Sequence, residues 1–176
     1  ATDTVVDGLL QLMGHARKDL LIISPYFVPG PDMLQAFAAA RARGVRVRVL
    51  TNSLASNDAP IAHAGYARHR PALLAMGVEL FEMRSELTGL RGAFSTTGST
   101  GGSRAMLHSK LLVMDGRLLV VGSMNLDQRS QRQNTEIALL IRSRDLSGRV
   151  TERIEQALGA LAWQVTQSPD QPLRWH

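Results

Sequence analysis

The sequence predicts an α/β fold, with a mixed and largely parallel β-sheet that is flanked by helices on both faces, as in an αβα sandwich. Helical and strand-like segments alternate through the first half, a pattern typical of parallel sheets covered by helices. The composition, 44% hydrophobic and 20% charged, is that of a globular chain. A length of 176 residues suits one domain that buries roughly two thirds of its unfolded surface.

The first elements follow from apolar spacing and from proline and glycine. Apolar residues at helical spacing predict a helix over residues 4–17, and the apolar run at 19–24 predicts a buried strand that Pro25 ends. Residues 31–44 predict a second helix, because proline stands near its start and glycine just past its end.

The βαβαβ pattern is completed further along the chain. Strict alternation of Val and Arg predicts a strand at 45–51, and a third helix over 63–77 leads into a third strand at 78–83. Residues 85–104, rich in Gly, Ser and Thr, predict a flexible surface loop. This loop lacks the Gly-Lys-Ser/Thr ending of a phosphate-binding loop.

The C-terminal part predicts one more amphipathic helix. From Thr151 onward, Ile154, Leu158, Leu161 and Val165 recur at helical spacing. The tail after Pro169 is expected to be ordered only where it docks on the rest of the domain.

The stretch HSKLLVMDGRLLVVGSMN at 108–125 sets polar residues into apolar runs. Asp115-Gly116 between such runs predicts a hairpin with a two-residue turn, in which Met114 faces Arg117. Asp115 is expected to accept backbone hydrogen bonds at that turn, roughly 23 Å from the start of the stretch along an extended strand.

This register would gather four polar side chains on one face at the open end of the hairpin, and a three-residue turn would shift it by one position. The four residues are His108, Lys110, Ser123 and Asn125. Imidazole can act as nucleophile or general acid/base, ammonium supplies positive charge, and amide and hydroxyl groups bind oxyanions. The set suits phosphoryl chemistry and requires no metal or other cofactor.

The charge of the chain agrees with an anionic partner. A formal charge of +5 favours phosphodiesters, nucleic acid or an acidic membrane face, although a solvated basic surface is the simpler explanation. There are no cysteines, so neither disulfides nor thiolate metal sites are available. No apolar run approaches the ~18 residues that a membrane span requires.

These residues resemble the HxKxxxxD(x)6GSxN signature of the phospholipase D superfamily. The matching positions are His108, Lys110, Asp115, Gly122, Ser123 and Asn125. Three further segments, at 23–30, 51–70 and 126–141, resemble the second half of bacterial cardiolipin synthases. The resemblance implies a phospholipase D fold over residues 1–176.

In that superfamily, two such motifs meet and share one active site. One His attacks phosphorus to form a phosphohistidine, while the other protonates the leaving alkoxide and later deprotonates the incoming alcohol. Lysine and asparagine side chains hold the phosphoryl oxygens. Because this chain carries one motif, we expect it to be the C-terminal domain of a longer two-motif chain or a subunit of a homodimer. His108 could fill either role.

The resemblance also suggests residues outside the motif. It implies that Glu136, on the strand after the hairpin, orients an active-site His, although a strand-edge carboxylate is the plain alternative. His63 and Tyr66 are expected to reach the substrate, or else to be packed. Arg129 is expected to meet phosphate or acidic lipid, or else to be an ordinary surface residue.

The sequence therefore predicts a phosphatidyltransferase of the cardiolipin synthase type that supplies half of an active site. Its substrate would be a phospholipid such as phosphatidylglycerol, and the protein would be bacterial, cytoplasmic or peripheral on the inner membrane. One alternative is a dimeric endonuclease or phosphodiesterase of the superfamily, which would act on nucleic acid. Another is a non-catalytic lipid-binding half-domain.

Overall fold

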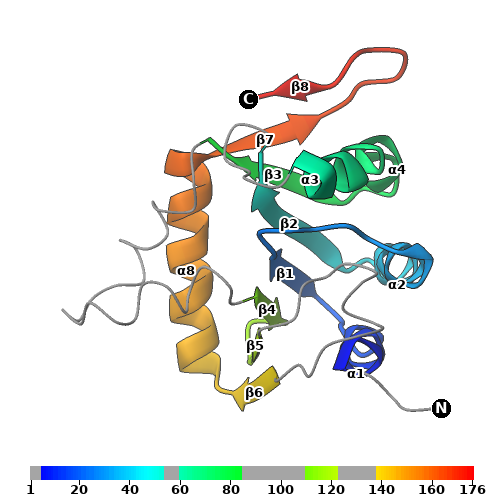
Figure 1. Cartoon of the computed structure of the whole chain (residues 1–176). Helices are drawn as coiled ribbons and strands as arrows, with labels where there is room; N and C mark the ends of the chain where they lie inside the picture. Colours follow the sequence, from blue (N-terminus) through cyan, green and yellow to red (C-terminus); the bar gives the residue numbers. More distant parts are fainter. Residues whose placement is uncertain (1–4, 54–59, 85–109, 123–137) are drawn as a thin grey trace.

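The computed structural model describes residues 5–53, 60–84, 110–122 and 138–176, which form one eight-stranded sheet with helices on both faces (Figure 1). The strand order is β6-β5-β4-β1-β2-β3-β7-β8. The strands are β1 (Asp19–Ile23), β2 (Arg46–Asn52), β3 (Glu79–Met83), β4 (Lys110–Met114), β5 (Leu118–Gly122), β6 (Ala138–Arg142), β7 (Ala162–Thr166) and β8 (Arg174–Trp175). The α/β fold class is confirmed.

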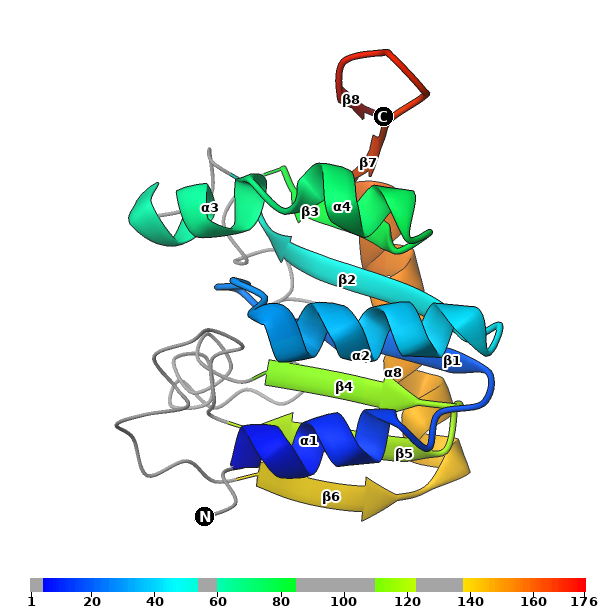
Figure 2. The ribbon, with the colours of Figure 1, turned by 90° about the vertical axis from the view of Figure 1, so that its right-hand side faces the viewer.

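The helices divide unequally between the two faces. They are α1 (Val5–Met13), α2 (Pro31–Ala42), α3 (Pro60–Ala67), α4 (Arg70–Ala75) and α8 (Arg144–Leu161). The first four cover one face and α8 covers the other (Figures 1 and 2). The predicted helix at 63–77 is thus two helices, and Pro71 lies in the first turn of the second, where it cannot donate to a preceding turn.

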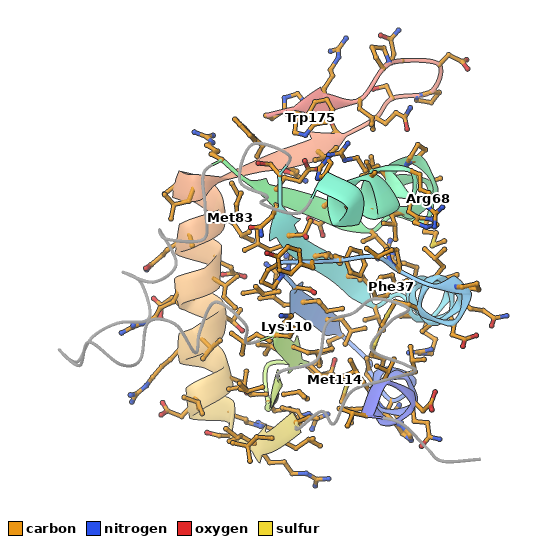
Figure 3. The ribbon with its side chains drawn as sticks, in the orientation of Figure 1. Phe37, Arg68, Met83, Lys110, Met114 and Trp175 are labelled. Atoms are coloured by element: carbon orange, nitrogen blue, oxygen red, sulfur yellow. The ribbon has the colours of Figure 1, made fainter. Side chains whose placement is uncertain are left out.

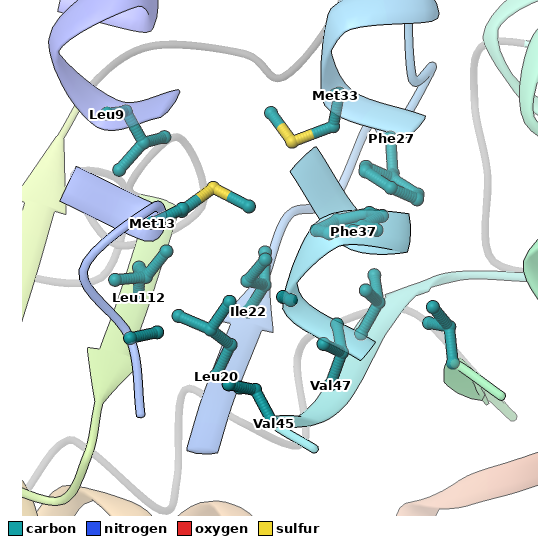
Figure 4. Close-up of a cluster of buried hydrophobic side chains, with 14 of the residues drawn as sticks. Leu9, Met13, Leu20, Ile22, Phe27, Met33, Phe37, Val45, Val47 and Leu112 are labelled. Carbon is teal, nitrogen blue, oxygen red and sulfur yellow. The ribbon is translucent and has the colours of Figure 1, made fainter. Parts of the chain in front are cut away.

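Each face has its own hydrophobic core, because successive strand side chains point to opposite sides of a sheet. On the face of α1 and α2, Leu20 and Ile22 of β1 pack with Leu112 of β4 and with Met13 and Phe37 of the helices (Figure 4). On the other face, neighbouring strand residues pack against α8. Burial on both faces explains why β1, β4 and β5 read as nearly continuous apolar runs.

The sheet is less parallel than predicted. Among the strands of the described ranges, β1, β2 and β3 run parallel to one another, and the other five pairings are antiparallel. The helical crossovers of the first half do produce parallel neighbours. From β4 onward, the chain forms a tight hairpin and then adds strands at both sides of the sheet. Each of these strands runs antiparallel to its neighbour.

The hairpin register also differs from the prediction. Met114 pairs with Leu118 rather than facing Arg117, so residues 115–117 form a three-residue turn. Asp115 and Gly116 both have positive φ, at 55° and 64°, and the amide of Arg117 donates to the carbonyl of Met114 over 3.1 Å. The extra residue shifts every cross-strand pair by one position, and Lys110 lies opposite Gly122.

The final helix ends earlier than predicted. α8 begins at Arg144, with the hydroxyl of Ser143 accepting from the amide of Leu146, and it stops at Leu161. Val165 therefore belongs to β7, which pairs with β3, and not to the helix. Its spacing fits either structure, and the extended backbone at Ala162 decides between them.

The C-terminal tail does dock, because β8 pairs with β7. The predicted loop at 85–104 lies outside the described residues.

Candidate functional site

One edge of the sheet, called here the carboxyl edge, is where β1, β2 and β3 end and β4 begins. The opposite edge, where those three strands begin and the hairpin turns, is called the amino edge. The registers pair Ile23 with both Leu50 and Leu111, so one step further along the strands Ser24 lies beside Thr51 and Lys110. Ligands of open α/β sheets bind outside the carboxyl ends of the parallel strands.

A row of polar residues crosses the sheet at this edge. Thr51 pairs with Glu82, and Lys110 pairs with Gly122. The polar row consists of Gly122, Lys110, Ser24, Thr51 and Glu82 on five adjacent strands. Apart from the glycine, its members are between 0% and 5% exposed. Because burying polar groups is costly unless they are bonded, a continuous buried row indicates a specific use.

Two members of the polar row fix the chain that leaves β1. The hydroxyl of Ser24 donates to the carbonyl of Tyr26 over 3.1 Å, and the hydroxyl of Thr51 donates to the carbonyl of Pro25 over 3.3 Å. These bonds hold the segment after β1 against the end of β2. Phe27 of the same segment contacts Tyr66 of α3, with ring centroids 6.0 Å apart. The carboxyl edge is therefore tied to the helix that follows β2.

Lys110 is the motif side chain that lies in the polar row. It opens β4 at the carboxyl edge, while Met114 closes the strand at the other end (Figure 3). Lys110 is 5% exposed, and it is one of only two lysines in a chain otherwise supplied with arginines. Gly122 lies directly beside it and has no side chain to occupy the space.

Three of the motif residues lie outside the described residues. They are His108, Ser123 and Asn125, and the two additional candidates Glu136 and Arg129 lie outside as well. The shared face predicted for His108, Lys110, Ser123 and Asn125 rested on the two-residue turn, which is wrong. Their assignment now rests on the motif alone and stays a prediction.

Asp115 lies at the amino edge, in the hairpin turn, where the sequence places it. Its carboxylate accepts hydrogen bonds from the backbone amides of Arg17, Lys18 and Asp19, over 2.7 to 3.2 Å. Burial raises the pKa of Asp115, but these amide hydrogen bonds outweigh burial and hold the pKa below its ordinary value. Asp115 therefore fastens the hairpin to the start of β1 and takes no part at the carboxyl edge.

A buried ion pair adjoins the polar row. Arg70 of α4 donates to Glu82 through Nε over 2.8 Å and through Nη2 over 2.7 Å. The carboxylate of Glu82 also accepts from the hydroxyl of Tyr66 over 3.0 Å and from the indole of Trp175 over 3.3 Å. The Arg70 guanidinium lies over the rings of Tyr66 and Trp175, 5.1 and 5.3 Å from their centroids. With His63, these residues form what is called here the Arg70 cluster.

His63 completes the cluster from α3. Its Nε2 lies 3.2 Å from Nη2 of Arg70, and its ring meets that of Tyr66 edge-on at 5.9 Å. Burial, with the positive charge of Arg70, lowers the pKa of His63 below its ordinary value. Burial also raises the pKa of Tyr66, with help from the negative charge of Glu82. Both side chains are packed, at 7% and 1% exposed.

Two buried polar atoms at this edge have no hydrogen-bond partner among the residues that the structure describes. They are Nδ1 of His63 and Oδ1 of Asn52, the last residue of β2. In contrast, every oxygen of the Glu82 carboxylate is engaged. Buried polar groups are normally paired, so these two atoms call for an explanation.

Sequence reasoning missed Arg70, Glu82 and Trp175. A carboxylate inside the apolar run at 78–83 was the available signal for Glu82, since a buried charge requires a partner. Nothing local identifies that partner, and Trp175 comes from a tail 93 positions further along. Within the described ranges, no group of three or more His, Asp or Glu side chains could hold a metal ion.

Comparison with known families identifies relatives of the chain. A family model described as "Cardiolipin synthase, PLD-like domain" matches residues 9–158. Cardiolipin synthase C of Escherichia coli (strain K12) is 40% identical over 160 residues, which covers 89% of this chain and 33% of that protein. Cardiolipin synthase A of Proteus mirabilis (strain HI4320) is 31% identical over 139 residues, covering 79% of this chain and 24% of that protein. The chain thus spans a third or less of these relatives.

Solved structures share the fold. Nuc from Salmonella typhimurium, described as a phospholipase D family member, superposes with a TM-score of 0.65 at 19% identity, over 94% of this chain and 93% of that one. Phosphatidylserine synthase from Haemophilus influenzae Rd KW20 gives a TM-score of 0.63 at 18% identity, over 89% of this chain and 36% of that one. Within the described part of the chain, no helix is long and apolar enough to cross a bilayer.

Proposed function

Since the chain belongs to the family of phospholipase D-like domains of cardiolipin synthases, we propose that it catalyses phosphatidyl transfer and supplies half of the active site. The donor would be a phospholipid such as phosphatidylglycerol, and the acceptor an alcohol carried by a second lipid. The other half would come from a second HxKxxxxD domain, either in the same chain or in a second copy of this one.

The position of Lys110 carries the proposal. The motif lysine is buried, opens β4 at the carboxyl edge, and stands in the polar row beside Gly122 of the same motif. A fixed ammonium at the edge where α/β proteins bind ligands can hold the phosphoryl oxygens of a diester. His108 precedes this lysine by two positions and Ser123 follows Gly122 directly. We therefore propose that His108, Ser123 and Asn125 act at this edge together with Lys110, whereas Asp115 of the same motif anchors the opposite end of the hairpin.

The reaction proceeds in two displacements at phosphorus. One imidazole attacks phosphorus, the bond to the leaving glycerol oxygen breaks, and the second imidazole gives that oxygen its proton. The acceptor hydroxyl then loses its proton to the second imidazole and attacks phosphorus, and the phosphohistidine bond breaks. His108 supplies one of the two imidazoles. Lys110, Ser123, Asn125 and Arg129 bind the phosphoryl oxygens, and Glu136 orients an imidazole.

The site of action would be the inner face of a bacterial inner membrane. The formal charge of +5 attracts the chain to anionic phospholipid, which is also the proposed substrate. The named relatives above are bacterial. Peripheral contact of this kind would weaken as salt screens the charges.

The test is an assay of the chain, alone and paired with an upstream half, on vesicles that contain phosphatidylglycerol. Cardiolipin is measured by mass spectrometry. His108→Ala and Lys110→Gln should each lower the rate by roughly a hundredfold or more. The matched control is Lys18→Gln, because Lys18 is the other lysine and its side chain is exposed at the amino edge. Full activity in His108→Ala would refute the proposal.

The same proteins decide between the alternatives. Cleavage of nucleic acid with a steep salt dependence, and no lipid product, would assign the chain to the nuclease class. Vesicle binding without turnover in any pairing would indicate a non-catalytic lipid-binding half-domain. Cardiolipin formation that requires His108 would exclude both as the main function.

A further inference from the structure

The hydrogen bond between His63 and Arg70 fixes which ring nitrogen of His63 carries a proton. A guanidinium has only donors, so Nη2 of Arg70 must donate to Nε2 of His63, 3.2 Å away. Nε2 is therefore the acceptor, and the proton of the neutral ring is on Nδ1. The lowered pKa of His63 agrees with a neutral ring at pH 7.

That Nδ1–H is a donor without an acceptor. Nδ1 is buried and has no hydrogen-bond partner among the described residues, although the His63 ring contacts Tyr66 and its Nε2 lies beside Arg70. Leaving a buried donor unpaired destabilises the folded chain, because the group has lost its water without gaining another partner. A protein tolerates such a cost where a ligand supplies the missing acceptor, and the oxygens of a phosphodiester are acceptors of this kind.

The donor lies at the edge where the substrate is expected. α3 extends at the end of the sheet where β2 finishes and β4 starts (Figure 2). Gly65 packs so closely on the segment after β1 that a Cβ there would lie 3.0 Å from Cγ1 of Val28. Tyr66 of the same helix binds Glu82 in the polar row. α3 thus contacts β3 and the segment that follows β1, and both adjoin the row that contains Lys110.

We propose that His63 donates its Nδ1–H to an oxygen of the phosphodiester substrate, and that Arg70 and Glu82 are positioning residues that fix its tautomer. This inference rests on the proposed function for the identity of the substrate. Arg70 is held by two hydrogen bonds to Glu82 and by the rings of Tyr66 and Trp175, so its Nη2 has little freedom to turn away from His63. The tautomer is therefore set before substrate arrives.

Two amide substitutions separate the two ring nitrogens. His63→Gln carries its amide near the position of Nε2 and can still accept from Arg70, but it has no donor at Nδ1. His63→Asn carries its amide nitrogen near the position of Nδ1 and can still donate to substrate, but it no longer reaches Arg70. We expect KM for phosphatidylglycerol to rise roughly tenfold or more in His63→Gln and clearly less in His63→Asn.

The reverse order, with His63→Asn the more impaired, would show that His63 only supports Arg70 and would overturn the proposal. Unchanged KM in both variants, with only a lower melting temperature, would overturn it as well. Turnover that survives His108→Ala would refute the proposed function without bearing on His63.

Nuclear magnetic resonance tests the proposal without turnover. Long-range ¹H–¹⁵N spectra of the whole chain should show His63 as the Nδ1–H tautomer, and soluble dihexanoyl phosphatidylglycerol should shift its Nδ1 signal. Free glycerol should not shift this signal. The Nε2–H tautomer, a signal unmoved by the lipid, or an equal response to glycerol would each overturn the assignment, whatever the activity of the chain.

Discussion

Both edges of the sheet contain an arginine paired with a glutamate, but at very different depths. At the carboxyl edge, the Arg70 and Glu82 side chains are 10% and 2% exposed. At the amino edge, Arg46 and Glu79 are 53% and 30% exposed, with Nε and Oε2 only 2.6 Å apart. Contact distance therefore does not distinguish the two pairs, whereas burial does.

The deeper pair makes further hydrogen bonds, whereas within the described part of the chain the side-chain hydrogen bonds of the outer pair are those between Arg46 and Glu79. Glu82 accepts from Tyr66 and Trp175 in addition to Arg70, which satisfies a carboxylate that water cannot reach. Burying two charges costs several kcal/mol for each ion, and only complete hydrogen bonding offsets that cost. The buried pair lies beside the candidate site, and its hydrogen bonds join α3, α4 and the C-terminal tail to β3.

The largest expected effect comes from breaking the buried pair. Glu82→Gln keeps the shape of the side chain but leaves Arg70 charged and without its carboxylate. The free energy of unfolding should fall by about 3–5 kcal/mol, measured by urea denaturation. Arg70→Met combined with Glu82→Leu should recover part of the loss, because no buried charge remains. A Glu82→Gln protein as stable as the parent would mean that the depth of the pair has no energetic importance.

Substitution of Asp115 tests the amino edge, because its carboxylate accepts hydrogen bonds from three backbone amides there. Asp115→Asn removes the charge from three backbone hydrogen bonds and should cost about 1–3 kcal/mol in the free energy of unfolding. Asp115→Ala should cost about 1–2 kcal/mol more, because alanine is strained at a φ of 55° and also removes the acceptor that asparagine keeps. Equal losses in the two variants would contradict a contribution from the backbone conformation.

At low pH, the free energy of unfolding should fall because carboxylates at the amino edge become protonated. The hydrogen bond from Arg46 lowers the pKa of Glu79, and the backbone amides lower that of Asp115. A carboxylate with a lowered folded pKa stabilises the fold above its unfolded pKa of roughly 4, and this contribution disappears as pH falls through the folded pKa. Urea midpoints recorded from pH 6 down to pH 2 should decline less steeply in Asp115→Asn combined with Glu79→Gln. A slope identical to that of the parent would exclude this explanation.

Substitution of Trp175 tests the contribution of one neutral hydrogen-bond donor in the Arg70 cluster. Trp175→Phe removes the indole N–H that Glu82 accepts over 3.3 Å, but keeps an aromatic ring against Arg70. We expect a loss of about 1 kcal/mol in the free energy of unfolding, seen as a small shift of the thermal midpoint. A loss as large as that of Glu82→Gln would show that the docking of β8, and not the hydrogen bond, was disturbed.

Glu79→Gln should have the smallest effect. Its partner Arg46 is more than half exposed, so solvent screens the pair and either side chain can be hydrated when it is broken. The expected loss at neutral pH is under about 1 kcal/mol, measured by urea denaturation beside Glu82→Gln. A loss above 2 kcal/mol would show that burial is the wrong basis for ranking the two edges.

The sequence correctly predicted the features that depend on residues close together in the chain. The βαβαβ order follows from apolar spacing with proline and glycine boundaries, and Asp115 was placed at a turn because Asp-Gly accepts positive φ. The length of that turn could not be read in the same way. The Asp115 carboxylate is held by amides 96 to 98 positions away, and this tertiary anchor accompanies the three-residue turn.

The same limit applies to the candidate site. Lys110 was identified by its motif, but the two-residue turn predicts Val121 as its strand partner, whereas the partner is Gly122. Val165 fits helical spacing after Leu161, yet pairing with Leu80 of β3 decides its structure. The Arg70 cluster joins α3, α4, β3 and β8, and no sequence window contains all of its members.

The central position of β1 has a consequence for the order of assembly. β1 lies between β2, its near neighbour in sequence, and β4, which the chain reaches only after a much longer excursion. Closing the longer loop costs more entropy and comes later in folding than nearby pairing. We therefore expect β1 to β3 to gain protection first in pulsed hydrogen exchange during refolding, and β4 afterwards. Lys110 would then join Ser24, Thr51 and Glu82 after the strands that carry or adjoin them have already paired.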